Sequence, residues 1–352
     1  MAQEPPQKAT IIGISGPSSS GKTTLARLLQ RIFCGVNLTT NDNNKTNLNT
    51  FIIHEDDFYF PDDQIPTVTL PSGKQIQDWD TASAIDIPFL SKALTYVREH
   101  GTLPPRLRSK EDQNDQGESG VDDSLILQLR DTVQRELSSI SSSTEGLMRT
   151  VAFLEGFLLF SPPDGSISAS ASMGNVNENV TAQQDKDNHI LRPVHNAINL
   201  HLFLPAPYEL VKARREGRSG YVTIGPAPEI CDSSNVTDNG TKPGSGDVDL
   251  EGEDDRPPQN FWTDPPGYVD DIVWPRYVGD HSWLLVADEK GQEEGGDGED
   301  LADLVRRVGD GRRVRRDVGV EVAPGCGEEG MEVVLRWSVE LILAYLAKGK
   351  TV

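Results

Sequence analysis

The chain has 352 residues, of which 55 are acidic and 33 basic, so its formal net charge at neutral pH is −22. This charge argues against a general nucleic-acid or membrane-surface binder, but a phosphate site built from local donors is compatible with it. Apolar residues make up only 36% of the chain, and the deficit is local, which indicates one compact core with polar insertions.

The spacing of the cysteines and the length of the apolar runs indicate the cellular compartment of the protein. Cys34, Cys231 and Cys326 form no C-x-x-C pair, so we expect neither disulfides nor a zinc site. Residues 1–8 lack the apolar segment of a signal peptide, and no apolar run approaches the roughly 18 residues that span a bilayer. These observations predict a protein of the cytoplasm or nucleus whose partner is a small molecule, with no nucleic acid and no membrane.

The first predicted element is a short β-rich apolar run, residues 10–15. Directly after it, residues 16–23 match the pattern G-x-x-x-x-G-K-[ST], and leucines and isoleucines at helical spacing follow. A strand, a glycine-rich loop and a helix in this order are typical of a phosphate-binding loop. The residues that we expect to bind ATP here are Gly16, Pro17, Ser18, Ser19, Ser20, Gly21, Lys22, Thr23 and Thr24.

The chemistry of this loop follows from its residue types. Glycines let the backbone curl so that successive N–H groups converge on one anion, and the helix N-terminus adds partial positive charge. Lys22 can reach the β- and γ-phosphates, and the Thr23 hydroxyl can ligate Mg²⁺. The sequence therefore predicts a protein that binds a nucleoside triphosphate.

A second strand at residues 51–54 leads into an acidic pair, Asp56 and Asp57. In an open parallel sheet, ligands bind beyond the carboxyl ends of the strands, so either carboxylate could activate a hydroxyl; spacing alone leaves the choice open. Residues 61–78 are rich in proline and predict an irregular segment, after which Trp79 stands between two aspartates. We interpret Trp79 as a stacking surface for a ring, with an adjacent carboxylate reaching sugar hydroxyls.

Further elements follow in order along the chain. We expect helices at residues 85–98, 125–137, 208–218 and 333–347, and strands at residues 151–154, 197–204 and 283–287. Glu155 ends one of these strands, where P-loop enzymes commonly keep a carboxylate for magnesium or its water shell. Arg214 and Arg218 share one face of a basic helix and Arg215 borders it, as in a closing lid that stabilises a transferring phosphoryl group.

Polar segments interrupt this pattern. Residues 229–255 contain nine acids against one lysine, too few apolar groups to offset the entropy of ordering. We expect residues 1–8 to be a disordered tail and residues 9–352 one P-loop kinase domain. Its flexible insertions are expected near residues 35–50, 104–122, 161–189, 222–260 (in the lid) and 289–300. Strands alternating with helices predict a three-layer α/β fold, a mostly parallel five-stranded sheet with helices on both faces and a lid.

Several motifs together resemble one family, the nicotinamide riboside kinases within the uridine kinase-like P-loop kinases. The matching pieces occur in the family's order and cover roughly half of the chain. They are Ile11 to Leu25, Asp56 to Tyr59, Trp79-Asp80, Glu155 to Phe160, Pro207 to Glu209, Lys212 to Arg218, Asp264 to Tyr268 and Val273 to Pro275. The segments E-G-F-L-L-F and D-P-P-G-Y are more specific than the phosphate loop.

The resemblance implies roles for particular positions. Asp56 would be the catalytic base and, with Thr23, a magnesium contact, while Lys22 and Arg214 would stabilise the transferring phosphoryl group. Arg214 and Arg218 would also bind ATP. The substrate-binding residues would be Asp56, Asp57, Phe58, Tyr59, Trp79, Asp80, Glu155, Arg215 and Asp264.

Two features distinguish this chain from the better-known members. Trp79 stands where they have tyrosine, and tryptophan is the stronger partner for a cationic pyridinium ring. More than forty residues separate Tyr221 from Asp264, where family members cross the lid in a few.

The leading hypothesis is an ATP- and Mg²⁺-dependent kinase that phosphorylates the ribose 5′-hydroxyl of nicotinamide riboside, and possible further substrates include nicotinic acid riboside. The alternatives are a uridine/cytidine kinase or another small-metabolite kinase of the same fold, and a non-catalytic P-loop interaction protein. If the hypothesis holds, Lys22 and Asp56 must face one cavity.

Overall fold

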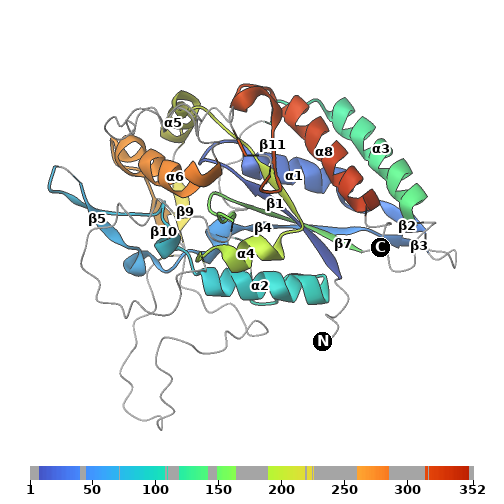
Figure 1. The fold of residues 1–352 in the computed structure, drawn as a ribbon, viewed down its shortest axis with the longest axis horizontal. Coiled ribbons are helices and arrows are strands. Elements are labelled where there is room, and N and C mark those ends of the chain that lie inside the picture. Colours follow the sequence, from blue (N-terminus) through green and yellow to red (C-terminus); the bar gives the residue numbers. More distant parts are fainter. Residues whose placement is uncertain are drawn as a thin grey trace, which may run out of the picture.

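The computed structural model places a parallel sheet at the centre of the molecule (Figure 1). The structure describes residues 8–39, 45–70, 72–107, 109, 119–141, 149–163, 189–218, 220–223, 225, 260–284, 314–315 and 317–348. None of the helices in these ranges is long and apolar enough to cross a membrane.

The central sheet has five strands, all parallel, in the order β11-β8-β1-β7-β4. The strands are β1 (Ala9–Ser15), β4 (Asn49–His54), β7 (Thr150–Gly156), β8 (Leu200–Phe203) and β11 (Val320–Val322). Strands β1 and β7 are buried along their whole length, as expected for a sheet covered on both faces. The predicted fold class is confirmed.

Helices cover both faces of the sheet (Figure 1). Their bounds are α1 (Lys22–Phe33), α2 (Ile87–His100), α3 (Asp123–Ser141), α4 (Arg192–Ala197), α5 (Tyr208–Glu216), α6 (Trp274–His281) and α8 (Met331–Lys348). Helices α1, α3 and α8 share one apolar core with the sheet, whereas α2, α4 and α6 contribute to the core on the opposite face. The sheet thus lies between two apolar layers, which fixes its carboxyl edge in space.

Short helical turns and three hairpins complete the described structure. The turns are η1 (Glu55–Phe58), η2 (Asp62–Gln64), η3 (Ala82–Ala84), the π-helical η6 (Val269–Val273), η7 (Ser282–Leu284) and η9 (Pro324–Gly327). The hairpins pair β2 (Asn37–Thr39) with β3 (Lys45–Asn47), β5 (Thr67–Thr69) with β6 (Gln75–Gln77), and β9 (Tyr221–Thr223) with β10 (Asn260–Trp262).

Two predicted strands differ from the structure. The prediction of a strand at residues 283–287 is wrong: Trp283 and Leu284 lie in the 3-10 turn η7, and residues 285–287 fall outside the described residues. The fifth strand is β11, whose three residues are too few to show a two-residue period. The strand predicted at residues 197–204 begins only at Leu200, because Ala197 still belongs to α4.

The segments predicted to be flexible or irregular differ in outcome. Residues 35–50, expected to be a flexible insertion, contain the hairpin β2–β3, in which Leu38 is buried. Residues 61–78, expected to be irregular, contain the hairpin β5–β6, in which Ile76 is buried. The segments near 104–122, 161–189, 222–260 and 289–300 lie largely outside the described residues. Of the segment near 222–260 the structure describes the two ends, which pair as β9 and β10 with Thr223 opposite Asn260.

This pairing generates a prediction. Because Thr223 and Asn260 are cross-strand neighbours, the intervening chain leaves and re-enters the fold at one place, and a short turn can join the strands. Replacing residues 226–258 by Asn-Gly should change the melting temperature by less than about 3 °C, since shortening a loop alters closure entropy only slightly. Thermal unfolding followed by circular dichroism checks this. A fall of about 10 °C would show that residues 226–258 contribute to the stability of the core.

Candidate active site

The register of β7 with its two neighbours brings three strand ends together. Ser15 at the end of β1 pairs with Gly156, and His54 at the end of β4 pairs with Glu155. The loops that follow these strands enclose a cavity, here called the inner cavity. It is lined by Ser18, Ser19, Gly21, Lys22, Thr23, Thr24, Asp56, Tyr59, Trp79, Asp80, Glu155, Gly156, Phe157, Arg215, Arg218, Tyr221, Val222, Thr223 and Trp262.

The loop between β1 and α1 forms one wall of this cavity. A side chain at Gly16 would place its Cβ 2.2 Å from the carbonyl oxygen of Leu204, so only glycine lets the loop pass here. The hydroxyl oxygens of Ser19 and Ser20 are buried and have no partner among the described residues. Two buried hydroxyls without partners, in a loop that leads into a helix N-terminus, fit an anion that is bound in the loop.

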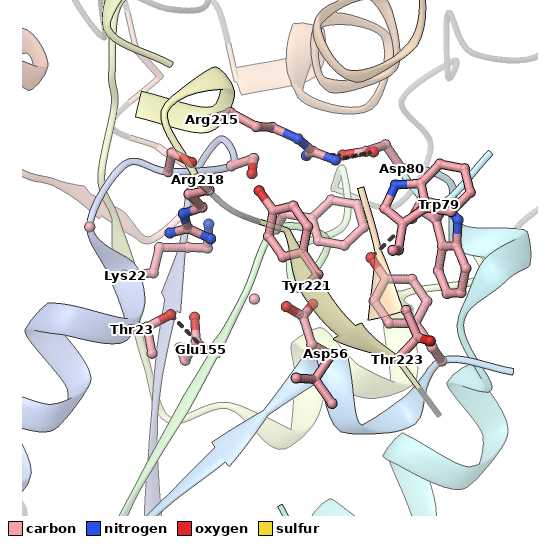
Figure 2. Close-up of a pocket in the computed structure, with 18 of the residues that line it drawn as sticks. Lys22, Thr23, Asp56, Trp79, Asp80, Glu155, Arg215, Arg218, Tyr221 and Thr223 are labelled. Atoms are coloured by element: carbon pink, nitrogen blue, oxygen red, sulfur yellow. Dashed lines mark hydrogen bonds and ion pairs between the residues drawn. The ribbon is translucent and has the colours of Figure 1, made fainter. Parts of the chain in front are cut away.

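Lys22 points from the start of α1 into the inner cavity (Figure 2). Its side chain is buried, and its ammonium donates a hydrogen bond to the carbonyl of Pro17 at 2.9 Å. Burial lowers the pKa of Lys22, while the negative charges of Glu155 and Asp56 act to raise it. A buried ammonium beside an anion-binding loop is well suited to neutralise phosphate charge.

A buried chain of hydrogen bonds runs from β4 to α1 through the end of β7. The Glu155 Oε1 atom lies 2.7 Å from His54 Nδ1 and accepts the Thr23 hydroxyl at 3.1 Å (Figure 2). Burial alone would raise the pKa of Glu155, but His54, the charge of Lys22 and the hydrogen bond from Thr23 together outweigh it, so the pKa is lowered. Glu155 is therefore held as a carboxylate beside Thr23. Sequence analysis did not predict this contact of His54.

Asp56 lies opposite the loop, in η1 after β4, and its carboxylate points into the same cavity as Lys22 (Figure 2). Lys22 and Asp56 thus face one cavity, as the kinase hypothesis requires. Burial, with a further contribution from the charge of Glu155, raises the pKa of Asp56 to about 6. A carboxylate with such a pKa can accept a proton near neutral pH.

The oxygen donors fit a magnesium ion that arrives with a nucleotide. Thr23, Asp56 and Glu155 supply hydroxyl and carboxylate oxygens, the ligands that Mg²⁺ prefers. Within the described ranges no three His, Cys, Asp or Glu side chains converge closely enough to hold a metal. Magnesium in kinases is usually bound by one or two carboxylates together with substrate phosphates, so a complete protein cage is not required.

Glu55 connects the segment that carries Asp56 to the segment after β7. Its side chain is fully buried, and its Oε2 atom accepts the backbone N–H groups of Phe157 at 2.7 Å and Leu158 at 3.0 Å. Burial raises the pKa of Glu55 to about 8. Gly156 lies against this carboxyl group, because a Cβ atom at Gly156 would approach Glu55 Oε2 to 2.3 Å and Glu55 Cβ to 2.5 Å. The two strand-end segments therefore fit together only with glycine at position 156.

Aromatic side chains form the far end of the inner cavity. The ring of Trp79 lies 5.3 Å from that of Tyr59 and 5.6 Å from that of Trp262, measured between centroids. Tyr59 in turn stacks with Phe157 at 6.5 Å. The backbone N–H of Trp79 donates to the Tyr268 hydroxyl at 2.9 Å, which fixes the indole. These walls suit a flat ring, and a cationic ring in particular.

Arg215 of α5 occupies a buried ion-pair network beside this aromatic end. It makes two hydrogen bonds to Asp80, at 2.9 and 3.1 Å (Figure 2). It makes two more to Asp264, at 2.7 and 3.3 Å. The two carboxylates thus offset the free-energy cost of burying the charged guanidinium group, as a buried arginine requires. Asp264 also accepts the indole N–H of Trp262 at 2.9 Å.

A second cavity, here called the outer groove, adjoins the inner cavity across the loop. Both are lined by Ser19, Gly21, Thr23, Thr24, Arg218 and Tyr221. The outer groove is further lined by Ser20, Arg27, Leu28, Arg31, Ser119, Leu204, Pro205, Arg214, Gly217, Gly220, Ala323, Pro324, Gly327, Glu328, Glu329, Gly330, Met331 and Val334. Arg214 donates to the carbonyl of Ser19 at 3.3 Å on this side of the loop.

Some of the predicted site residues lie elsewhere. Asp57 and Phe58 are buried away from both cavities, Phe58 packing against Phe89, so the structure gives no basis for placing them against a substrate. Asp264 lines neither cavity and acts through Arg215. Gly16 and Pro17 also line neither cavity. Gly16 lies close to the Leu204 carbonyl, and the Pro17 carbonyl accepts the hydrogen bond from Lys22.

Sequence analysis assigned no site role to six residues that line the inner cavity: Gly156, Phe157, Tyr221, Val222, Thr223 and Trp262. The last four come from the hairpin β9–β10. Their three-residue strands border a long polar segment, and they show no periodicity that sequence analysis could detect.

A phosphate loop at the carboxyl edge of a parallel sheet, with a carboxylate facing it, defines a P-loop kinase. A family model described as the phosphoribulokinase / uridine kinase family matches residues 11–99. A nicotinamide riboside kinase of Schizosaccharomyces pombe is 30% identical over 280 residues, 80% of this chain and 82% of that protein. Those of Saccharomyces cerevisiae and Eremothecium gossypii are 25% and 24% identical, over 80% and 78% of this chain and 80% and 77% of those proteins. The chain belongs to the nicotinamide riboside kinase family.

The contact between Glu55 and Gly156 generates a prediction. Gly156→Ala should lower the free energy of unfolding by about 1–3 kcal/mol, because the added methyl group overpacks a buried contact. Urea unfolding measures the change. In a Glu55→Ala background the same substitution should cost much less; an equal cost in both backgrounds would show that Glu55 is not the obstacle.

Proposed function

We propose that the protein transfers the γ-phosphoryl group of ATP to the ribose 5′-hydroxyl of nicotinamide riboside, giving nicotinamide mononucleotide. The observation that carries the proposal is the presence of two cavities that meet at one phosphate loop, with Asp56 on the side opposite Lys22. The nucleotide base lies in the outer groove, its phosphates in the loop, and the nucleoside in the inner cavity.

Asp56 accepts the proton of the 5′-hydroxyl as that oxygen attacks the γ-phosphorus, and the bond between that phosphorus and its bridging oxygen to the β-phosphate breaks. Lys22 and the loop amides hold the phosphates, while Arg214 of α5 and Arg218, two residues beyond the end of that helix, offset charge on the transferring group. Thr23 and Asp56 would hold Mg²⁺, which when bound neutralises phosphate charge.

The nucleoside is recognised by its ring and its sugar. The ring of nicotinamide riboside carries a positive charge, so its binding against the aromatic wall formed by Trp79, Trp262 and Tyr59 adds cation–π attraction to apolar contact. Asp80 faces the cavity and accepts hydrogen bonds from the ribose hydroxyls, with Arg215 fixing its orientation.

A substrate panel at fixed ATP and magnesium tests this function. We expect the highest kcat/KM with nicotinamide riboside, lower values with nicotinic acid riboside, and little turnover of uridine or cytidine, whose rings are uncharged. Asp56→Asn should reduce kcat at least about a hundredfold, because it removes the base, while affinity for a fluorescent ATP analogue is kept. A preference for uridine would identify a pyrimidine nucleoside kinase instead, and full activity of Asp56→Asn would remove Asp56 from the mechanism.

The pKa of Asp56 generates a pH prediction. Only the ionised carboxylate can accept a proton, and burial raises the pKa of Asp56 to about 6. The value of kcat/KM for nicotinamide riboside should therefore be constant above pH 7 and fall about tenfold per pH unit below pH 6. Initial rates between pH 5 and pH 8, with unfolding monitored at each pH, check this. A flat profile down to pH 5 would contradict the assignment.

A further inference from the structure

We infer that Asp62 is a positioning residue that holds the hairpin β9–β10 against the nucleoside site and so sets the affinity for the nucleoside. Asp62 begins η2, six positions after Asp56, and lines neither cavity. The identity of the nucleoside in this inference rests on the proposed function. The contact between Asp62 and the hairpin is independent of that function.

Asp62 bonds to both strands of the hairpin at the end where the long polar segment leaves it. Its Oδ2 atom accepts the Thr223 hydroxyl at 2.8 Å and the Asn260 side-chain amide at 3.0 Å. Its Oδ1 atom accepts the backbone N–H of Gly225 at 3.0 Å, and its own N–H donates to the Gly225 carbonyl at 2.8 Å. One carboxylate thus accepts from three donors that lie on both sides of residues 226–259.

The far side of the hairpin faces the inner cavity. Tyr221, Val222, Thr223 and Trp262 all line it, although within the described part of the chain β9 and β10 form a sheet of two strands, separate from the central sheet. A two-stranded hairpin is marginally stable by itself, so its position depends on what holds it. Arg215, bonded to Asp264, holds it at one end, and Asp62 holds it at the other.

The segment around Asp62 also carries residues of the nucleoside site. Asp56 and Tyr59 lie within the six residues before Asp62. The backbone carbonyl of Asp62 accepts a hydrogen bond from the Gln77 side-chain amide at 2.5 Å, and Gln77 lies two positions before Trp79. A shift of the hairpin away from Asp62 would therefore separate Trp262 from Trp79, whose rings are 5.6 Å apart. The phosphate loop is not in this network, and of the residues in β9 and β10 Tyr221 alone also lines the outer groove, so ATP binding should depend on the hairpin much less than nucleoside binding does.

Asp62→Ala tests the inference. We expect the KM for nicotinamide riboside to rise at least about tenfold, because three hydrogen bonds to one carboxylate are lost, while the KM for ATP stays within about twofold. Near-ultraviolet circular dichroism should lose the signal of the Trp79–Trp262 pair without ligand. Asp63→Ala, which removes the same charge from an exposed neighbour, serves as the matched control and should behave as wild type.

Asn260→Ala is a milder second variant, because Asn260 is exposed and lines neither cavity. It should raise the KM for the nucleoside severalfold in the wild-type background and not at all beside Asp62→Ala, since its amide acts through that carboxylate. Equal rises in both KM values, additive effects of the two substitutions, or an unchanged KM in Asp62→Ala would overturn the inference.

The inference about Asp62 and the proposed function can fail independently of each other. If the wild type does not phosphorylate nicotinamide riboside, the function fails, and the tryptophan signal of Asp62→Ala still reports whether Asp62 places the hairpin. If the wild type is active and the variant retains both the signal and its KM, the inference about Asp62 fails alone.

Discussion

The position of β7 between β1 and β4 is the constraint on which the site depends. Main-chain hydrogen bonds align Gly156 with Ser15 and Glu155 with His54, so the segments that follow the three strands start at one level. A register shift by one residue would turn Glu155 toward the opposite face of the sheet and separate it from Thr23. Because apolar layers bury the sheet on both faces, such a shift would also expose core residues, and the register is strongly specified.

The Glu55 carboxyl group also holds together two of the segments at this edge of the sheet. It satisfies two backbone amides after β7, which would otherwise be buried donors without partners. In doing so it ties Phe157, a wall of the inner cavity, to the segment that carries Asp56. Glu55 directly precedes the motif Asp56 to Tyr59, and Gly156 belongs to the motif Glu155 to Phe160, far along the chain. The structure shows that these two residues are the two halves of one contact.

Sequence analysis predicted the features that local pattern encodes. The strand, loop and helix at residues 10–33, the strand ends at Asp56 and Glu155, and the helices on both faces all follow from periodicity and motif. It missed β11 and β9–β10, because three-residue strands are defined by their partners rather than by their own composition. It also misplaced Asp57 and Phe58, since a 3-10 turn directs adjacent side chains to different sides and only Asp56 reaches the cavity.

The arrangement of the two cavities has a kinetic consequence. They share residues of the loop together with Arg218 and Tyr221, and their other lining residues differ, so the nucleotide and the acceptor can be resident at the same time. The acceptor oxygen then attacks phosphorus directly, and no side chain of the protein carries the phosphoryl group between two half-reactions. Double-reciprocal plots for a catalyst built in this way intersect instead of running parallel, and neither product has to depart before the second reactant enters.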